Sequence, residues 1–398
     1  MTDTTVSPDD IVIVGAARTA QGKMLGALAA KSAVELGSTA ISGALERARV
    51  TANNVDFVYM GQVVQAAAGQ NPAKQAAVAA GLGMNVPAMT VNKVCLSGLD
   101  AIINAARMIK AGDATVVVAG GQESMSNAPH LAAGVRAGKG FGELRLDDAL
   151  ERDGLTDPVQ GTAMGVETDA NAEAAGLNRE EQDHIAALSH QRAEQAIAEG
   201  TFSDEIVPIE VATRKETVTV SQDEGVRPGT TAEGLAKLRP AFRKEGTITA
   251  GSSSQISDGA AAVVLTTREN AEAKGWNILA TVGAAGQTAG PDTSLLSQPS
   301  QAVKAALAKA GWETGDLDFL EINEAFGAVV AQSLKDLDYS LEKTNIHGGG
   351  ISLGHPIGCS GARVLVTAAH ELNRRGSGKA AVSLCGGGGQ GDALLIWK

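Results

Sequence analysis

Short uninterrupted apolar runs alternate along the chain with segments whose apolar residues recur at helical spacing. The first run, residues 11–14, is too short for a helix and stops at Gly15, as a strand buried on both faces would. Residues 99–110 follow helical spacing as far as Gly112, and the apolar run 115–119 comes next. The order strand, helix, strand predicts an α/β fold with a buried sheet.

The same order returns near the C-terminus. Residues 360–372 have helical spacing, and residues 379–384 form an apolar run that ends at Cys385. Ser97-Gly98 at the start of the first predicted helix matches Ser360-Gly361 at the start of the second. We therefore expect an internal duplication of an α/β half.

The segment between the two units has a different pattern. Charged residues become frequent, long apolar runs disappear, and a helix is predicted from Asn178 to Gly200, with acidic residues in its first turn. Buried-strand character returns at residues 260–265. We predict an N-terminal core half of residues 1–121 plus 246–271, an inserted domain of residues 122–245, and a C-terminal core half of residues 272–398.

Composition narrows the classes of function. The 398 residues include 44% apolar but only 3% aromatic side chains, and 48 glycines, which predicts small aliphatic cores between closely approaching backbones. The net charge of −12 argues against a nucleic acid or an anionic membrane as the main partner. Three cysteines are too few for a disulfide framework and indicate a reducing compartment, so we expect a cytoplasmic protein.

Cys95 directly precedes the first predicted helix. Unpaired N–H groups at a helix N-terminus favour a negative charge, which would lower the pKa of this thiol below its usual value of about 8.5. Such a position suits a nucleophile. The alternative is a small buried side chain that fills a corner between strand and helix.

Cys385 ends the last predicted strand and enters a run of glycines, Gly386 to Gly391. The run satisfies G-x-G-x-x-G, but the chain ends too soon for the helix that a dinucleotide site requires, so a Rossmann site is rejected. The glycines instead suggest backbone N–H groups that approach a ligand oxygen, as in an oxyanion hole. A cysteine buried at a strand end is the alternative for Cys385.

His355 lies in the Gly- and Pro-rich stretch GHPIG, where it cannot fill a core from a helix face. Asn323 follows the apolar run 319–322 and stands at the predicted start of a helix, so a simple N-cap is one reading of it. The six histidines and the cysteines show no metal-ligand spacing. We therefore expect no metal site.

Taken together, these stretches resemble the thiolase family, and within it the acetyl-CoA acetyltransferases. The resemblance covers nearly the whole chain. It rests on eight motifs in the family's order: GQVVQAAAGQNPAKQAA (61–77), NKVCLSGLDAI (92–102), GGQESMSNAPH (120–130), LRPAF (238–242), ISDGAAAVVL (256–265), NEAFGAVVAQ (323–332), GHPIGCSGARV (354–364) and CGGGGQGDA (385–393).

The resemblance implies a thiolase fold, with duplicated βαβ-type halves in a five-layered core and an inserted loop domain. It implies that Cys95 is the nucleophile that carries the acyl group and Cys385 the acid and base that moves protons. His355 would activate Cys95 and, with a water held by Asn323, stabilise the enolate oxygen. The N–H groups of Cys95 and Gly387 would hold the oxygen of the tetrahedral intermediate.

The resemblance also implies substrates and partners. Coenzyme A and acetyl-CoA would be substrates, with no permanently bound cofactor, and the family's habit is a homotetramer built as a dimer of dimers. Arg227 matches a basic coenzyme A position, Ser254 a pantetheine contact, and Met164 a substrate-loop position. Many acetoacetyl-CoA thiolases have a histidine where this chain has Ala163, and Gln287 stands where a pocket methionine is expected.

The implied reaction is the reversible Claisen cleavage or condensation of acetoacetyl-CoA or another short 3-ketoacyl-CoA. Three alternatives remain open: a degradative thiolase for longer or branched chains, a non-catalytic acyl-CoA or lipid carrier on the same scaffold, and a decarboxylating ketoacyl synthase. The second thiol, Cys385, disfavours the last of these. Cys359, where alanine is usual, is interpreted as a packing residue.

Overall fold

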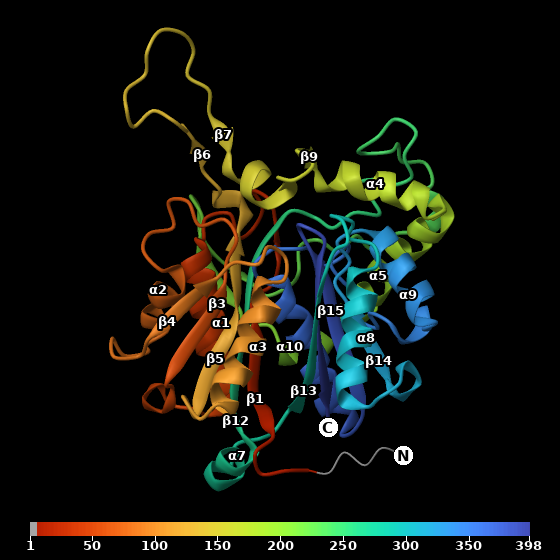
Figure 1. Cartoon of the computed structure of the whole chain (residues 1–398). Helices are drawn as coiled ribbons and strands as arrows, with labels where there is room; N and C mark the ends of the chain where they lie inside the picture. The colour runs from red at the N-terminus through yellow and green to blue at the C-terminus, as the bar shows by residue number, and fades with distance from the viewer. Residues whose placement is uncertain (1–5) are drawn as a thin grey trace.

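A computed structural model describes residues 6–398, so residues 1–5 of the predicted N-terminal half lie outside it. Ten strands form one mixed sheet in the order β14-β15-β16-β13-β1-β12-β5-β3-β4, with β2 paired to β12 (Figure 1). These strands are β1 (Ile11–Arg18), β2 (Gly22–Lys23), β3 (Phe57–Gly61), β4 (Ala88–Val91), β5 (Val116–Ser124), β12 (Ser257–Thr267), β13 (Ala280–Ala289), β14 (Phe319–Ile322), β15 (Lys379–Gly386) and β16 (Gln390–Trp397).

The two halves of the sheet meet at β1 and β13. These strands pair only through Val12 with Thr281 and Ile13 with Ala280, whereas β12 and β5 pair along nine residues. So short a ladder leaves the two halves free to diverge, and helices fill the space between them. The ten strands are therefore hydrogen-bonded into one sheet, and its two halves still form separate layers of the fold.

Helices complete the layers. Helices α1 (Ala33–Ala48) and α2 (Pro72–Ala79) cover the N-terminal half, and α8 (Gln298–Ala310) and α9 (Gly327–Leu337) cover the C-terminal half. Helices α3 (Ser97–Lys110) and α10 (Ser360–Arg375) lie side by side between the halves, while α7 (Arg268–Lys274) follows β12 (Figure 1). Three separate apolar clusters fill the spaces between these layers. The predicted five-layered α/β fold is confirmed.

Two predicted strand ends were wrong, and glycine is the reason in both. Strand β1 continues through Gly15, where a Cβ atom would lie 2.3 Å from the Ala44 carbonyl oxygen of α1. Strand β5 likewise continues through Gly121, where a Cβ atom would lie 2.0 Å from the Gly358 carbonyl oxygen. These glycines let a neighbouring segment pack closely against the strand, and the strand continues through them.

The duplicated Ser-Gly pairs bring two helix N-termini into contact. A Cβ atom at Gly98 of α3 would lie 2.8 Å from the Ala362 backbone nitrogen, and one at Gly361 of α10 would lie 2.4 Å from the Leu99 backbone nitrogen. Each glycine thus makes room for the other helix. The chain segments that precede the two helices are consequently held at one place in the molecule.

The segment after β5 folds over one end of the sheet. It contains β6 (His130–Leu131), β7 (Asp147–Asp148), β8 (Thr156–Asp157), β9 (Thr162–Ala163), α4 (Met164–Ala174), α5 (Arg179–Ala198), β10 (Ile209–Ala212), β11 (Thr217–Val220) and α6 (Ala232–Leu235). Helix α5 confirms the predicted one, and the Asn178 side chain caps it by accepting from the Glu181 N–H. Strand β5 reaches Ser124, so the predicted division after residue 121 falls within a strand.

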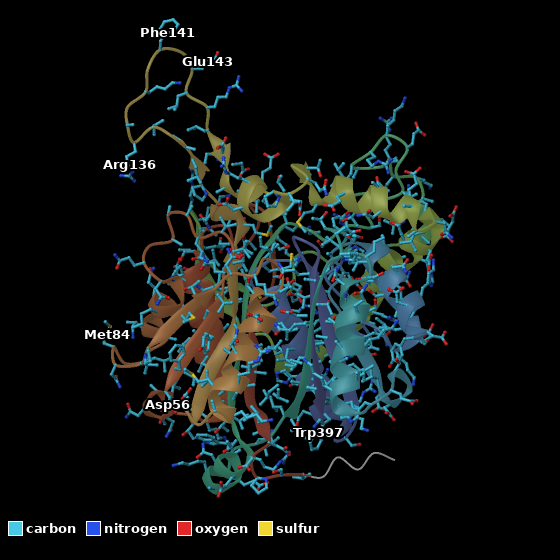
Figure 2. All side chains as sticks on the ribbon, viewed as in Figure 1. Asp56, Met84, Arg136, Phe141, Glu143 and Trp397 are labelled. Atoms are coloured by element: carbon cyan, nitrogen blue, oxygen red, sulfur yellow. The ribbon has the colours of Figure 1, made fainter. Side chains whose placement is uncertain are left out.

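Figure 2 shows the connection between β6 and β7 projecting from the body, with Phe141 and Glu143 at its tip. The Phe141 side chain is fully exposed there. Within residues 6–398, none of the helices combines the length and apolar character needed to cross a bilayer.

Candidate active site

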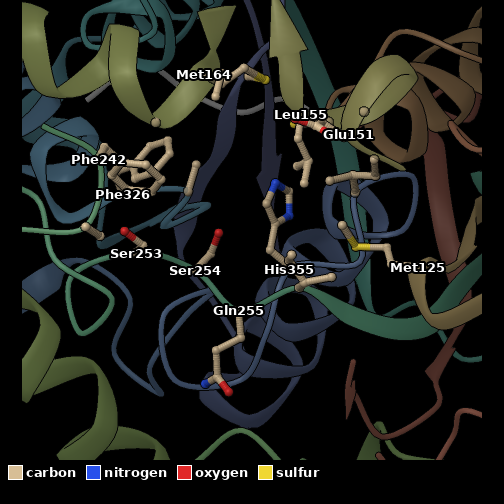
Figure 3. Close-up of a pocket in the computed structure, with 18 of the residues that line it drawn as sticks. Met125, Glu151, Leu155, Met164, Phe242, Ser253, Ser254, Gln255, Phe326 and His355 are labelled. Atoms are coloured by element: carbon tan, nitrogen blue, oxygen red, sulfur yellow. The ribbon is translucent and has the colours of Figure 1, made fainter. Parts of the chain in front are cut away.

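A cavity of about 480 Å³ opens where the inserted segment covers the sheet. Four of the predicted site residues line it, namely Cys95, Met164, Ser254 and His355. Figure 3 shows the His355 ring directed into the space between Met164, Leu155 and Ser254. The remaining wall is mostly apolar and includes Met125, Leu155, Phe242, Ile256, Phe326 and Ile357.

Cys95 follows a strained turn that links β4 to α3. Val94 has a φ of 52°, a left-handed conformation that is costly for a β-branched residue. The turn is held by the Asn92 Oδ1 atom, which accepts from the Val94 N–H at 3.0 Å. Ser97 Oγ accepts from the Lys93 N–H at 2.8 Å and donates to the Val94 carbonyl at 2.6 Å. The position of Cys95 is thus fixed by its neighbours on both sides.

The expected low pKa of Cys95 is wrong for the free protein. Helix α3 begins at Ser97 with Leu96 as its N-cap, so Cys95 lies outside the helix end. Burial raises the pKa of the Cys95 thiol to about 12, although hydrogen bonds from the N–H groups of Cys95 and Gly387 act in the opposite direction. Desolvation outweighs these donors, and the resting group is a neutral thiol.

Cys385 lies at the end of β15, paired with Gly391 of β16. Burial raises its pKa, and a charge on Cys95 raises it further, so the two sulfur atoms are close enough to interact electrostatically. The glycines after Cys385 pack on the nucleophile turn, because a Cβ atom at Gly387 would lie 3.3 Å from Val94 Cγ1. The segments that contain Cys95 and Cys385 thus lie together although they are far apart in the sequence.

His355 and Asn323 form a second buried pair. The Asn323 Nδ2 atom lies 3.4 Å from each ring nitrogen of His355, and Nδ1 lies 2.6 Å from Ser360 Oγ. Burial, together with the positive charge of Arg363, lowers the pKa of His355 to about 3. When Ser360 donates to the Pro356 carbonyl, at 2.9 Å, Nδ1–H donates to Ser360 and Nε2 is left as a proton acceptor.

Asn323 is not a helix cap, so that reading was wrong. Helix α9 begins at Gly327 with Phe326 as its N-cap, and the Asn323 N–H donates to the Ser383 carbonyl at 2.9 Å. Its side chain is buried, and its Oδ1 atom has no hydrogen-bond partner within residues 6–398. A buried acceptor in this state commonly binds an ordered water.

Most of the chain matches two family models. Residues 11–269 match the thiolase N-terminal domain, and residues 276–398 match the thiolase C-terminal domain. The chain belongs to the thiolase family. It is 52% identical to a protein of Mycolicibacterium smegmatis named "Probable acetyl-CoA acetyltransferase", over 97% of this chain and 100% of that protein.

Two further relatives agree with this family. The acetyl-CoA acetyltransferase of Pseudomonas aeruginosa is 49% identical over 97% of this chain and 99% of its own length. The crystal structure of the Bacillus anthracis acetyl-CoA acetyltransferase superposes with a TM-score of 0.95 at 41% identity, covering 98% of both chains. The likeness extends across both halves and the inserted segment of this thiolase.

One buried residue of this thiolase was missed by the sequence interpretation. Glu123, in the quoted motif GGQESMSNAPH, accepts from the N–H groups of Val63, Val64 and Gly358 at 2.9, 3.2 and 2.9 Å. Burial raises its pKa to about 8. Glu123 connects the GHPIG loop to the segment after β3, and only its place in a quoted motif pointed to it.

Two predicted contacts lie elsewhere in this thiolase. Arg227 is exposed and is not part of the cavity wall, and its N–H donates to His190 Nδ1 at 3.1 Å. Gln287 is not part of the cavity wall, and its Nε2 donates to Asp100 Oδ1 at 2.8 Å. Within residues 6–398, no group of three or more His, Cys, Asp or Glu side chains is arranged to hold a metal ion.

Proposed function

We propose that this thiolase is an acetyl-CoA acetyltransferase that reversibly cleaves acetoacetyl-CoA, or condenses two acetyl-CoA molecules. The observation that carries the proposal is the meeting of Cys95 and His355 on one cavity, with Cys385 close enough to respond to the charge on Cys95. A single buried thiol could be a packing residue. Two interacting thiols beside a neutral imidazole supply a nucleophile, its base and a second proton carrier.

In the first half of the cleavage reaction, His355 Nε2 takes the Cys95 proton as the sulfur attacks the keto carbon. The N–H groups of Cys95 and Gly387 donate to the developing oxyanion, a donor arrangement whose single members typically contribute about 3 to 4 kcal/mol. The bond between the second and third carbons then breaks. Cys385 protonates the leaving enolate, whose oxygen is stabilised by His355 and the water on Asn323, and acetyl-CoA departs.

In the second half, the Cys385 thiolate takes the proton of the incoming coenzyme A thiol. The coenzyme A sulfur attacks the acetyl group on Cys95, and the same N–H groups hold the second tetrahedral oxygen. Cys95 leaves and recovers its proton from protonated His355. All three groups return to their starting states, so no metal or redox cofactor is needed to balance the cycle.

The neutral resting state suits this cycle. With the pKa of Cys95 near 12 and that of His355 near 3, no preformed thiolate and imidazolium pair exists at neutral pH. Proton transfer is therefore coupled to the arrival of the carbonyl carbon, which provides the electrophile. This arrangement limits unproductive reactions of a free thiolate in the empty cavity.

Coenzyme A would enter across the inserted segment, residues 122–245. Met164 and Ser254 line the cavity and would contact the pantetheine arm, while exposed Arg227 would meet a phosphate group at the protein surface. We also propose the division into two core halves and this inserted domain. A homotetramer in the cytoplasm completes the proposal, and three free cysteines support a reducing compartment.

The activity is tested by mixing the purified protein with acetoacetyl-CoA and coenzyme A and measuring acetyl-CoA formation. A series of 3-ketoacyl-CoA substrates of increasing length tests the degradative alternative, which the alanine at position 163 and the apolar cavity wall permit. Highest kcat/KM on acetoacetyl-CoA supports the proposal. Activity confined to long or branched chains would replace it with the degradative thiolase.

Replacing Cys385 tests whether the two thiols have different roles. We expect Cys385→Ala to acquire an acetyl group on Cys95 from acetyl-CoA but to turn over at least about a hundredfold more slowly, because the proton carrier is lost. Intact-protein mass spectrometry followed by peptide mapping measures the acetyl group. Acetylation of a residue other than Cys95 would contradict the assigned roles.

A further inference from the structure

A cluster of charged and amide side chains lies beside the nucleophile turn. Lys93 Nζ donates to both carboxylate oxygens of Asp392, at 2.7 and 2.9 Å, and lies 3.5 Å from Asp100 Oδ1. Gln287 Nε2 donates to Asp100 at 2.8 Å and approaches Asp392 Oδ1 at 3.3 Å. Arg107 in turn donates to Gln287 Oε1 at 2.7 Å. The reaction described above uses none of these residues.

The central pair of this cluster links the two halves of the protein. Lys93 belongs to the N-terminal half and precedes Cys95 by two residues. Asp392 belongs to the C-terminal half, on β16, where it lies opposite Leu384 and next to the Cys385 and Gly391 pair. The ion pair therefore joins the segment that carries one thiol to the hairpin that carries the other.

The contact between Lys93 and Asp392 is largely shielded from solvent. The Asp392 side chain has no exposed surface and that of Lys93 is 21% exposed. A buried carboxylate is costly without a cationic partner, and Lys93 opposes the rise that burial causes in the pKa of Asp392. The Lys93 ammonium is within hydrogen-bond distance of both carboxylate oxygens of Asp392, so the contact holds the two side chains at short range.

The segments that it joins need such a restraint. Val94, between Lys93 and Cys95, has the left-handed φ of 52°, and Gly387 packs directly against the Val94 side chain. Strained backbone persists only where its surroundings hold it. Lys93 is the residue next to the strained one, and its partner is anchored in a strand ladder of the opposite half.

We propose that the Lys93–Asp392 ion pair is a positioning contact that holds the Cys95 turn against the Cys385 and Gly387 hairpin. It thereby sets the alignment of the two thiols and of the oxyanion donors. The inference rests on the proposed thiolase activity, because it assigns a role within that reaction. It predicts that loss of the pair impairs the steps that need both thiols far more than the binding of substrate.

The first test is Lys93→Met. We expect the kcat for acetoacetyl-CoA cleavage to fall at least tenfold, while KM changes less than about twofold. Acetylation of Cys95 by acetyl-CoA should slow as well, because this half-reaction also uses Cys385 and the N–H groups of Cys95 and Gly387. Lys93→Arg keeps the positive charge and can donate to both carboxylate oxygens of Asp392, so it should recover part of the kcat that Lys93→Met loses.

The matched control is Arg179→Met in the inserted segment. Arg179 pairs with Asp183 at 2.6 Å, and its exposure of 20% beside a partner at 2% resembles that of Lys93 and Asp392. If the loss of any largely buried ion pair lowers stability, both Lys93→Met and Arg179→Met will show a lower free energy of unfolding. We expect only Lys93→Met to lose kcat, with the denaturant midpoints of the two variants compared directly.

The double variant Lys93→Gln/Asp392→Asn covers the case in which an unpaired buried charge prevents folding. It removes one charge of each sign while Asp100 keeps its hydrogen bond from Gln287, and it should fold with kcat reduced at least tenfold. Wild-type kcat in the folded double variant, or equal kcat in Lys93→Met and wild type, would overturn the inference. An inactive wild-type protein would instead refute the proposed function.

Discussion

Cys95 and Cys359 occupy related places in the duplicated fold. Cys359 is the N-cap residue of α10, and Cys95 lies just before α3, the helix that α10 contacts. Both thiols are buried, and burial raises both pKa values to about 12. Their surroundings differ, because Cys95 borders the cavity whereas Cys359 belongs to the apolar cluster between the sheet halves.

This difference shows what a helix N-terminus contributes and what it does not. Burial raises the pKa of both thiols, so a place before a helix does not by itself make a nucleophile. Cys95 differs by its access to the cavity, the Gly387 N–H and the facing His355 ring. The proposed reactivity of Cys95 therefore rests on its surroundings and not on a lowered pKa of the thiol.

The largest expected effect comes from Cys95→Ala. Removing the nucleophile should lower turnover of acetoacetyl-CoA at least about a thousandfold, in the range seen when other covalent nucleophiles are removed. The measurement is the rate of acetyl-CoA formation by variant and wild type at saturating substrate. A variant with more than a tenth of wild-type activity would show that the acyl group is carried elsewhere.

Substitution of the glycines at the contact between α3 and α10 should have the next largest effect, and that effect is on stability. We expect Gly361→Ala to lower the free energy of unfolding by about 1 to 3 kcal/mol, and by more than Gly98→Ala. The added methyl group would lie 2.4 Å from the Leu99 nitrogen in the first case and 2.8 Å from the Ala362 nitrogen in the second.

Urea denaturation measures these changes, with Gly140→Ala as the control. No atom lies within 4 Å of the position that a Cβ would take at Gly140. The control should therefore unfold like the wild type. Equal stabilities of Gly361→Ala and Gly140→Ala would show that the two helix ends are farther apart than described.

The pH dependence of alkylation should distinguish Cys95 from Cys359. Because the pKa of Cys95 is near 12, its thiolate fraction and its reaction with iodoacetamide should rise about tenfold per pH unit from about pH 7 to about pH 10. Cys359 has a similar pKa but no access, so it should remain unmodified in the folded protein. Peptide mass spectrometry after timed quenching distinguishes the two sites.

A plateau in the alkylation rate of Cys95 near about pH 8 would contradict this prediction. It would mean that the N–H groups of Cys95 and Gly387 stabilise the thiolate more than burial destabilises it. Such a result would restore the acidified nucleophile that the sequence suggested. It would leave the position of Cys95 in the cavity unchanged.

The smallest expected effect is that of Cys359→Ala. The change removes one buried sulfur atom from the central apolar cluster, so turnover should stay within about twofold of wild type while the free energy of unfolding falls by about 1 kcal/mol. Kinetics and urea denaturation of the same preparation measure both. A tenfold loss of kcat without unfolding would place Cys359 in the reaction.

Much of the architecture could be read from local pattern. Helices α3, α5 and α10 follow the predicted spacing, and their first residues agree with Ser97, Asn178 as cap, and Ser360. Strand ends were less predictable, since Gly15 and Gly121 read as breaks but serve close packing. A glycine's local signal is the same in both roles, and only the neighbouring element distinguishes them.

The candidate site was also only partly readable. Cysteine and histidine stand out in Gly-rich motifs, whereas Glu123 and Lys93 resemble ordinary charged residues until their partners are known. Asn323 looked like a helix cap because capping and loop positions share the same residue types. Gln287 was expected in the cavity, but the opposite half of the protein supplies its partner, Asp100.

The alternation of strands and helices, the duplication and the candidate reactive residues could be predicted without coordinates, because these follow from spacing and side-chain chemistry. Tertiary structure alone decided that Cys95 and Cys385 meet, that both are uncharged at rest, and that Lys93 finds Asp392. The physical reason is that desolvation and charge pairing depend on every group within a few ångströms, and most of those groups are far away along the chain.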